Sequence, residues 1–212
     1  MTRATRPVSR LPLALLPLIL LPLIPLSACG PLVEIGGNTP RPDAVYTLSA
    51  APPTAVPAGL TPIDLTKAVS VDTPTVPGAL QTLRIPVIVS DTAIQYVQGA
   101  QWSEQPNRLF QRLLADLLVQ SGRAVIDPGS SGQTAGRRLT GQLQAFGVDV
   151  RGSNKVTVRY DATLAGPGGI RQRRFEREAE LSAVQGPQVA EALNGVANLI
   201  AADVAAWIAS AP

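Results

Sequence analysis

The residue with the clearest chemistry in this sequence is Cys29, the only cysteine among 212 residues. It directly follows Leu26-Ser27-Ala28, after an apolar stretch over 11–26 and a basic start with three arginines and no acid. A basic start, an apolar middle and small residues before a cleavage point are typical of a secretory signal. A cysteine at the cleavage point is typical of a lipoprotein, in which the thiol accepts a lipid and the new amino terminus is acylated. The sequence therefore predicts a signal peptide over 1–28 and lipidation of Cys29.

A membrane-spanning helix is the alternative for the apolar stretch, but such a helix needs about 20 apolar residues. The stretch is shorter, and it contains four prolines, which disrupt helix interiors: Pro12, Pro17, Pro22 and Pro25. The residue after Cys29 is Gly30, whereas an aspartate there would favour retention in the inner membrane in enteric-type sorting. We therefore expect a lipid-anchored protein on the periplasmic face of the outer membrane.

The charge balance changes when the signal is removed. The whole chain has 18 Lys and Arg against 15 Asp and Glu, and the signal takes three arginines with it, so the mature chain is formally neutral. A nucleic-acid-binding protein should keep a basic excess, so we expect no nucleic-acid partner. A single cysteine also excludes an intramolecular disulfide, and the mature chain is large enough to fold around its core without one.

The sequence lacks the residues that most catalytic mechanisms need. The chain has no histidine, which removes the commonest general base and metal ligand and makes a Ser-His-Asp triad impossible. Neither a Gly-x-Ser-x-Gly elbow nor a Gly-x-x-x-x-Gly-Lys phosphate loop occurs. Acidic pairs such as Glu176 and Glu178 lie among arginines and are predicted to form solvated ion pairs. We expect no catalytic residue, metal or cofactor, with a carboxylate-only hydrolase as the alternative.

The candidate contact residues are basic or aromatic. Lys and Arg outnumber Asp and Glu between 137 and 178, and four arginines crowd one predicted strand: Arg171, Arg173, Arg174 and Arg177. They are either a charged edge that resists aggregation or a patch for an acidic protein or anionic headgroups. Tyr96 and Trp102 are the other candidates for a contact surface, and a buried role for Trp102 is equally open.

Apolar periodicity predicts the elements that must position these residues. Alternation over 83–89 predicts a strand, and Pro86 inside it predicts that the strand is an edge or carries a bulge. Residues 93–97 are a second short strand or its continuation. Leucines at helical spacing predict a core helix over 105–121, because its polar face is not basic enough for a membrane-surface helix.

The C-terminal half has the most regular pattern. A short strand over 123–127 and a loop over 128–136 precede an antiparallel three-stranded meander over 138–183, whose first strand changes phase as at a β-bulge, with Gly147 suited to it. An apolar stripe ending at Trp207 predicts a last helix from about residue 185. The predicted fold is α+β, with a mixed, mainly antiparallel sheet, a C-terminal three-stranded meander and two helices packed on one face.

The predicted domain organisation has three parts. The signal peptide occupies 1–28. Residues 29–80 hold the lipidated cysteine and a proline-rich tether, with one short strand near 44–49 that could join the sheet. The folded domain is predicted over 81–210.

The order of several short motifs resembles the ABC-type transport auxiliary lipoprotein family, whose members include the PqiC lipoprotein. After the cysteine come Tyr46-Thr47-Leu48, Arg84-Ile85-Pro86-Val87, Gln95-Tyr96, Gly99-Ala100-Gln101-Trp102-Ser103-Glu104, a leucine-rich helix and Ser121-Gly122-Arg123. The resemblance covers about 46–208. The long proline-rich segment and the Gly/Ser loop at 128–136 depart from the family pattern.

The resemblance implies a function. Family members resemble accessory parts of transporters that combine an MCE-domain protein, an inner-membrane permease and a cytoplasmic ATPase, and that move lipids or hydrophobic molecules between two membranes. The implied role is a non-catalytic docking component at the outer-membrane end, and the resemblance admits a homo-oligomer. The alternative is a structural envelope lipoprotein that binds peptidoglycan or an assembly machine.

Overall fold

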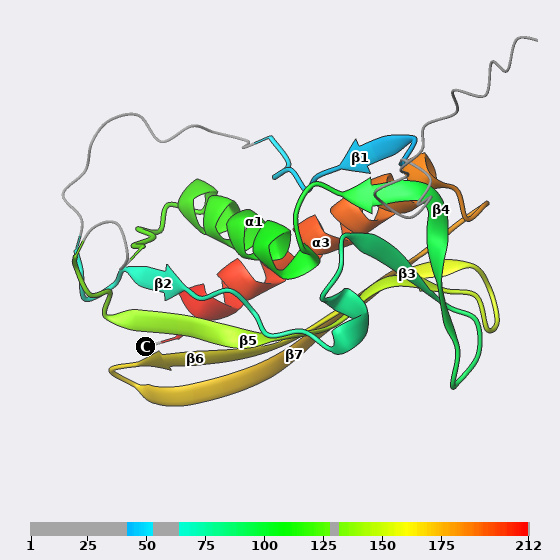
Figure 1. Cartoon of the computed structure of the whole chain (residues 1–212). Coiled ribbons are helices and arrows are strands. Elements are labelled where there is room, and N and C mark those ends of the chain that lie inside the picture. The colour runs from blue at the N-terminus through cyan, green and yellow to red at the C-terminus, as the bar shows by residue number, and fades with distance from the viewer. Residues whose placement is uncertain (1–41, 53–63, 128–131, 212) are drawn as a thin grey trace, which may run out of the picture. The chain divides into compact units, whose positions relative to one another are not determined.

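A seven-stranded mixed sheet organises the part of the chain that the computed structural model describes, residues 42–52, 64–127 and 132–211 (Figure 1). Cys29 and the signal lie outside these residues. The strands are β1 (Ala44–Tyr46), β2 (Val69–Val71), β3 (Arg84–Ile88), β4 (Ile94–Trp102), β5 (Arg137–Asp149), β6 (Lys155–Gly166) and β7 (Gly169–Glu180). The helices are η1 (Gly78–Leu80, a 3₁₀ turn), α1 (Pro106–Gln120) and α3 (Gly186–Ala209).

The strand order is β1-β4-β3-β5-β6-β7, with β2 beside β5. Strands β5, β6 and β7 form the predicted antiparallel meander, and β3 pairs antiparallel with β4. The pairs β1–β4, β2–β5 and β3–β5 are parallel, which makes the sheet mixed. The predicted α+β class, the meander and the two helices on one face are confirmed (Figure 1).

The two long helices bury their apolar stripes together. Pro106 occupies the first turn of α1, where its missing N–H costs nothing, and the helix buries Leu109, Phe110, Leu113, Leu114 and Leu118. Helix α3 alone among the described helices is long and apolar enough to cross a membrane. Most of its apolar side chains between Val189 and Ile208 are buried in the core, and that packing accounts for its hydropathy.

Aromatic pairs tie the helices to the sheet. The Phe110 ring of α1 lies edge-on to Tyr160 of β6, with ring centroids 5.2 Å apart. Trp207 of α3 meets Phe175 of β7 at 5.7 Å. The Tyr160 hydroxyl also donates a hydrogen bond to the Thr140 carbonyl of β5, which satisfies its buried polar atom. These contacts hold both helices over the same face and leave the opposite face of the sheet uncovered.

Two local predictions need correction. The segment 123–127 forms no strand, because only one residue, Val125, makes a bridge, to Val69 of β2. The β3–β4 register shifts between Arg84 and Pro86, so an irregularity does lie next to Pro86, but the extra residues belong to β4, where 97–100 lie opposite Ile85 alone. The edge alternative is wrong, since β3 has neighbours on both sides.

The bulge in β5 exists, but at another residue. The register with β6 shifts between Leu143 and Ala145, so Gln144 is the extra residue, and the predicted position at Gly147 is wrong. Gly147 instead allows two neighbouring strands to pack closely. A Cβ atom there would collide with the carbonyl oxygen of Pro86, so the missing side chain lets β3 approach β5.

The sheet also begins earlier than residue 81. The predicted strand near 44–49 is present as β1, and β2 and η1 both lie inside the segment assigned to the tether. Val69 and Leu80 are buried in the core. Strand β2 has only three residues and lies between prolines, so it is too short to show an alternating pattern. For this reason the sequence did not predict it.

A glycine in β4 provides a stability test. Gly99 has φ of +64°, and a Cβ there would clash with the carboxylate of Asp43, whose backbone N–H donates to the Gly99 carbonyl at 2.8 Å. We expect Gly99→Ala to lower the free energy of unfolding by about 1–2 kcal/mol or more. The matched control is Gly195→Ala, an exposed mid-helix site with open space for a Cβ, which should raise stability by about 0.5–1 kcal/mol. Urea denaturation of the mature chain measures both, and equal shifts of the same sign would contradict the prediction.

Candidate docking surface

The face of the sheet opposite α1 and α3, here called the open face, is the candidate functional surface. Along β6, the side chains of Val156, Val158, Tyr160, Ala162 and Leu164 point toward the helices and are buried. The alternate side chains therefore project from the open face. They are polar or charged, and they face the equivalent side chains of β7.

Cross-strand ion pairs run along this part of the open face. Arg159 pairs with Glu176, directly opposite it, and Arg174 makes a bidentate pair with Asp161 at 2.6 and 2.8 Å. Lys155 reaches Glu178 diagonally at 2.9 Å. The prediction that Glu176 and Glu178 form solvated ion pairs is confirmed. Each exposed pair contributes at most about 1 kcal/mol, so the pairs shape the surface more than they stabilise it.

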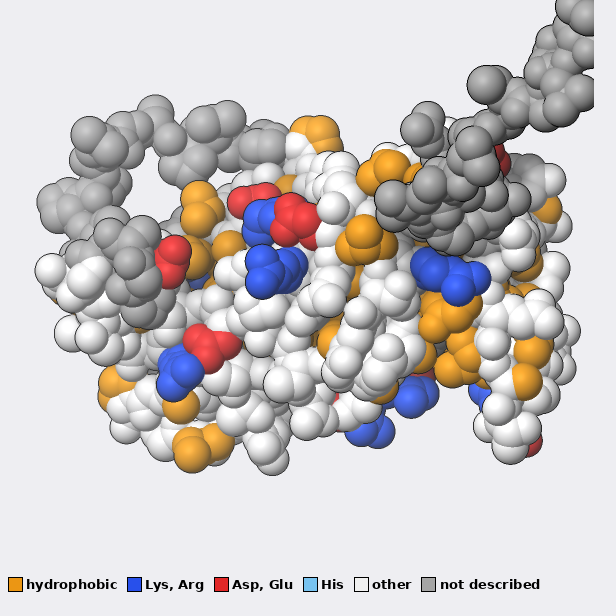
Figure 2. Space-filling view, viewed as in Figure 1, with side chains coloured by type: hydrophobic (Ala, Val, Ile, Leu, Met, Phe, Trp, Pro, Cys, Tyr) orange, Lys and Arg blue, Asp and Glu red, His pale blue; other side chains and the backbone are white. Residues whose placement is uncertain are grey.

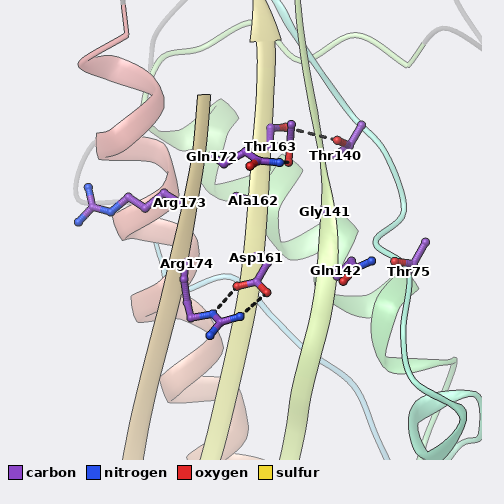
Figure 3. Close-up of a pocket in the computed structure, with 10 residues that line it drawn as sticks. All are labelled: Thr75, Thr140, Gly141, Gln142, Asp161, Ala162, Thr163, Gln172, Arg173 and Arg174. Carbon is purple, nitrogen blue, oxygen red and sulfur yellow. Dashed lines mark hydrogen bonds and ion pairs between the residues drawn. The ribbon is translucent and has the colours of Figure 1, made fainter. Parts of the chain in front are cut away.

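A shallow hollow of about 780 Å³ lies between these strands and the segment that carries Thr75 (Figure 3). Its polar groups are hydroxyls, amides and the Asp161–Arg174 pair, and Gln172 donates from Nε2 to the Thr163 hydroxyl at 3.2 Å. The hydrogen bond and charge of Arg174 lower the pKa of Asp161. A carboxyl group held ionised in this way suits binding better than proton transfer.

The arginines of β7 do not form one patch. Arg174 points to the open face, whereas the alternate residues Arg171 and Arg173 point to the helix side. The Arg171 guanidinium lies 5.7 Å from the centre of the Trp207 ring, and that of Arg173 lies 5.0 Å from the centre of the Phe175 ring. Arg177 is bound to Asp203 of α3 at 2.7 Å. Strand β7 is an edge of the sheet, the location that the charged-edge alternative requires.

The two aromatic candidates have opposite environments. Trp102 is 0% exposed on the helix side, with its ring 5.5 Å from that of Phe146, so its environment fits the buried role. Tyr96 is half-buried and lies opposite Pro86 in the β3–β4 register. The exposed guanidinium of Arg84 stacks 3.9 Å from the centre of the Tyr96 ring. Of the two, only Tyr96 offers a surface to a partner.

The end of β5 carries the most strongly shifted carboxyl. Hydrogen bonds from the Arg151 side chain lower the pKa of Asp149 from 3.8 to about 2, and the same guanidinium also binds Asp91 at 2.6 Å. A depressed pKa in the folded state adds stability above the unfolded pKa and loses it as pH falls through the folded value. The thermal unfolding midpoint should therefore fall between pH 4 and pH 2, in thermal melts followed by circular dichroism.

The contribution of Asp149 can be isolated with a variant. We expect Asp149→Asn to lose about 1 kcal/mol at neutral pH and to flatten the acid dependence. The control is Asp116→Asn on α1, an exposed carboxyl with no ion pair among the described residues. An unchanged acid slope in Asp149→Asn would show that the pair with Arg151 does not form in solution.

Solved structures share this architecture. The chain is similar to protein XCC0632 from Xanthomonas campestris, of the DUF330 family, at 18% identity and a TM-score of 0.62, covering 77% of this chain and 92% of that one. It is also similar to an uncharacterised protein at 17% identity and a TM-score of 0.59, covering 78% of this chain and 99% of the other. At such identities the likeness shows the fold alone.

The sequence itself carries the assignment further. No curated protein matches the chain. Residues 46–205, which are most of the chain, match the family described as the ABC-type transport auxiliary lipoprotein component. This confirms the resemblance found in the motifs. The chain belongs to the ABC-type transport auxiliary lipoprotein component family and is an auxiliary lipoprotein component of an ABC-type transport system.

Proposed function

We propose that this protein is anchored by lipid on Cys29 to the periplasmic face of the outer membrane, where it is a non-catalytic docking component of an MCE-type ABC transporter for lipids or other hydrophobic molecules. The observation that carries the proposal is the family match over 46–205 together with the lipoprotein signal that precedes it. The partners would be the MCE-domain protein and, through it, the permease and ATPase.

The open face supports a binding role. Its carboxylates Asp161 and Glu176 have lowered pKa values because arginines hydrogen-bond to them, so they stay ionised at neutral pH. Among the described residues, no group of three or more His, Cys, Asp or Glu could hold a metal ion. Charged and polar side chains fixed on a rigid sheet suit electrostatic recognition of a protein partner.

The distance from the membrane is bounded by covalent geometry. An extended chain spans at most about 3.3–3.6 Å per residue, so the segment between Cys29 and β1 can reach roughly 50 Å. We propose that this segment is the tether and that the sheet unit is the docking domain. The partner contacts that we propose are Tyr96, Arg171, Arg173 and Arg174.

The test is a pull-down of the acylated protein from detergent-solubilised envelopes, with bound proteins identified by mass spectrometry. Recovery of an MCE-domain protein with its permease is the expected result. Recovery of only peptidoglycan-linked or assembly proteins would overturn the transporter assignment and favour a structural envelope lipoprotein. Light scattering of the purified protein would measure whether it acts as a homo-oligomer.

The arginines then report which side of β7 meets the partner. Arg174→Ala changes the open face, and Arg173→Ala changes the helix side of the same strand. Because the two positions are adjacent and both exposed, they form a matched pair. A loss of capture with only one of them would assign the contact to that face, and equal capture with both would remove β7 from the proposed interface.

A further inference from the structure

An apolar hollow on the open face lies where β5 changes its neighbour. At one end of this region Thr75 bridges to Gln142, and at the other β3 pairs with β5 at Val148. The bulge at Gln144 lies between these two pairings. The sheet is therefore locally open on this side of β5, and η1 and the β3–β4 hairpin form the walls of a hollow of about 210 Å³.

The lining of this hollow is almost entirely apolar. Its main side chains are Ala79, Leu80, Pro86, Ile88, Ile94 and Ala145. Ile94 is 48% exposed although it is a large apolar residue. Figure 2 shows hydrophobic side chains gathered over the β3–β4 hairpin, with Lys or Arg side chains beside them. The volume is below the roughly 300–1,000 Å³ of sites for whole small molecules, and it suits one large apolar side chain.

The residues that border the lining, here called the rim, carry opposite charges at two places. Arg84 borders it through Tyr96, which lies opposite the lining residue Pro86, and Arg151 and Asp91 border it through the lining residue Asp149. Arg84, stacked on Tyr96, has no carboxylate within ion-pair distance in the part of the chain that the structure describes. At the hairpin end, Arg151 is shared by Asp149 and Asp91, which leaves a net negative charge. A ligand here would meet an apolar centre, a free cation at one side and an acidic group at the other.

We propose that this hollow receives an apolar side chain of the transporter's periplasmic protein, from a segment that carries an acidic residue to pair with Arg84. This inference rests on the proposed docking function. Interfaces concentrate their binding energy where an anchor side chain fills a central pocket and its surroundings exclude water. A phospholipid would match only Arg84 with its headgroup, would meet acidic groups at the other end, and would have acyl chains longer than the hollow.

The experiment compares four variants in the pull-down of the full acylated protein. Arg84→Glu reverses the free rim charge, and Ile94→Asp places a charge in the apolar lining. The matched controls are Arg108→Glu, an exposed arginine of α1 without an ion pair among the described residues, and Leu199→Asp, an apolar residue of α3 that is 58% exposed. Circular dichroism and urea denaturation verify that each variant folds. We expect at least a tenfold loss of captured MCE-domain protein with the first two variants and little change with the controls.

The outcomes separate the two proposals. Capture by the unaltered chain that persists in Arg84→Glu and Ile94→Asp overturns the hollow and leaves the docking function intact. Failure of the unaltered chain to capture any transporter component overturns the docking function, and the hollow assignment falls with it. Phospholipid that copurifies with the unaltered chain and is lost in Ile94→Asp, without a change in protein capture, would assign the hollow to a lipid and overturn the protein assignment.

Discussion

Replacing Trp102 with alanine should lower the free energy of unfolding by about 3–5 kcal/mol, the loss expected when a fully buried aromatic side chain is removed. The side chain is 0% exposed and packs against Phe146 of β5 from its position at the end of β4. Truncation would leave a cavity between the sheet and the helices that the close-packed core cannot fill. Urea denaturation of the mature chain measures the change, provided that the dependence of the free energy of unfolding on urea concentration (the m-value) is the same in both proteins.

A conservative variant separates packing from hydrogen bonding. The indole Nε1 of Trp102 is buried and has no hydrogen-bond partner among the described residues. Trp102→Phe therefore loses some volume but breaks no hydrogen bond, and we expect less than half the loss seen with alanine. A stable Trp102→Ala protein that no longer captures the transporter would contradict the buried role and return Trp102 to the contact surface.

The elements that the sequence predicted well are those with long regular patterns. Strand β6 alternates without interruption from Val156 to Leu164, and α1 repeats its leucines at helical spacing from Leu109 to Leu118. Each pattern is long enough that one face must be buried, so both the type of element and its buried face follow from local sequence. Pro106 and Gly122 then mark the start of the helix and the point just beyond its end.

The position of the β5 bulge and the burial of β2 depend on pairing between strands that are distant in sequence, so the local pattern could not predict them. The phase change in β5 shows that a bulge exists somewhere before Phe146, but only the register with β6 selects Gln144 over Gly147. Strand β2 has three residues, and its burial comes from β5 and α1, which are distant in sequence. The segment 123–127 has a composition suited to a strand, but only Val125 makes a bridge, to Val69 of β2.

The position of the proposed contact residues could be predicted in part from the sequence. Alternation along β7 places Arg174 on one face and Arg171, Arg173 and Arg177 on the other, so the division of the arginines follows from strand geometry alone. Strand geometry alone did not predict the apolar hollow. The hollow forms because the neighbour of β5 changes along the strand, from Thr75 at Gln142 to β3 at Val148. This arrangement exists only in the assembled sheet.

Replacing Cys29 with serine should abolish attachment of the protein to the outer membrane. We propose that Cys29 carries the lipid, and acyl chains on both its thiol and its new amino terminus would give the multiple anchors that stable attachment needs. Other routes to the membrane are weak in the described domain. Helix α3 buries most of its apolar residues in the core. Residues 29–212 are formally neutral, so they have no net charge to hold the protein on anionic headgroups.

The control changes the neighbouring residue and keeps the thiol. Gly30→Asp should leave the mass of the acylated amino-terminal peptide unchanged apart from the substitution, and should move the protein from the outer to the inner membrane fraction under enteric-type sorting. Cys29→Ser should instead remain unacylated and be absent from the outer membrane fraction. Mass spectrometry of the amino-terminal peptide and sucrose-gradient fractionation measure both effects. A Cys29→Ser protein found acylated in the outer membrane would require another attachment site and would overturn the anchor assignment, whereas unchanged sorting of Gly30→Asp would overturn only the inference about destination.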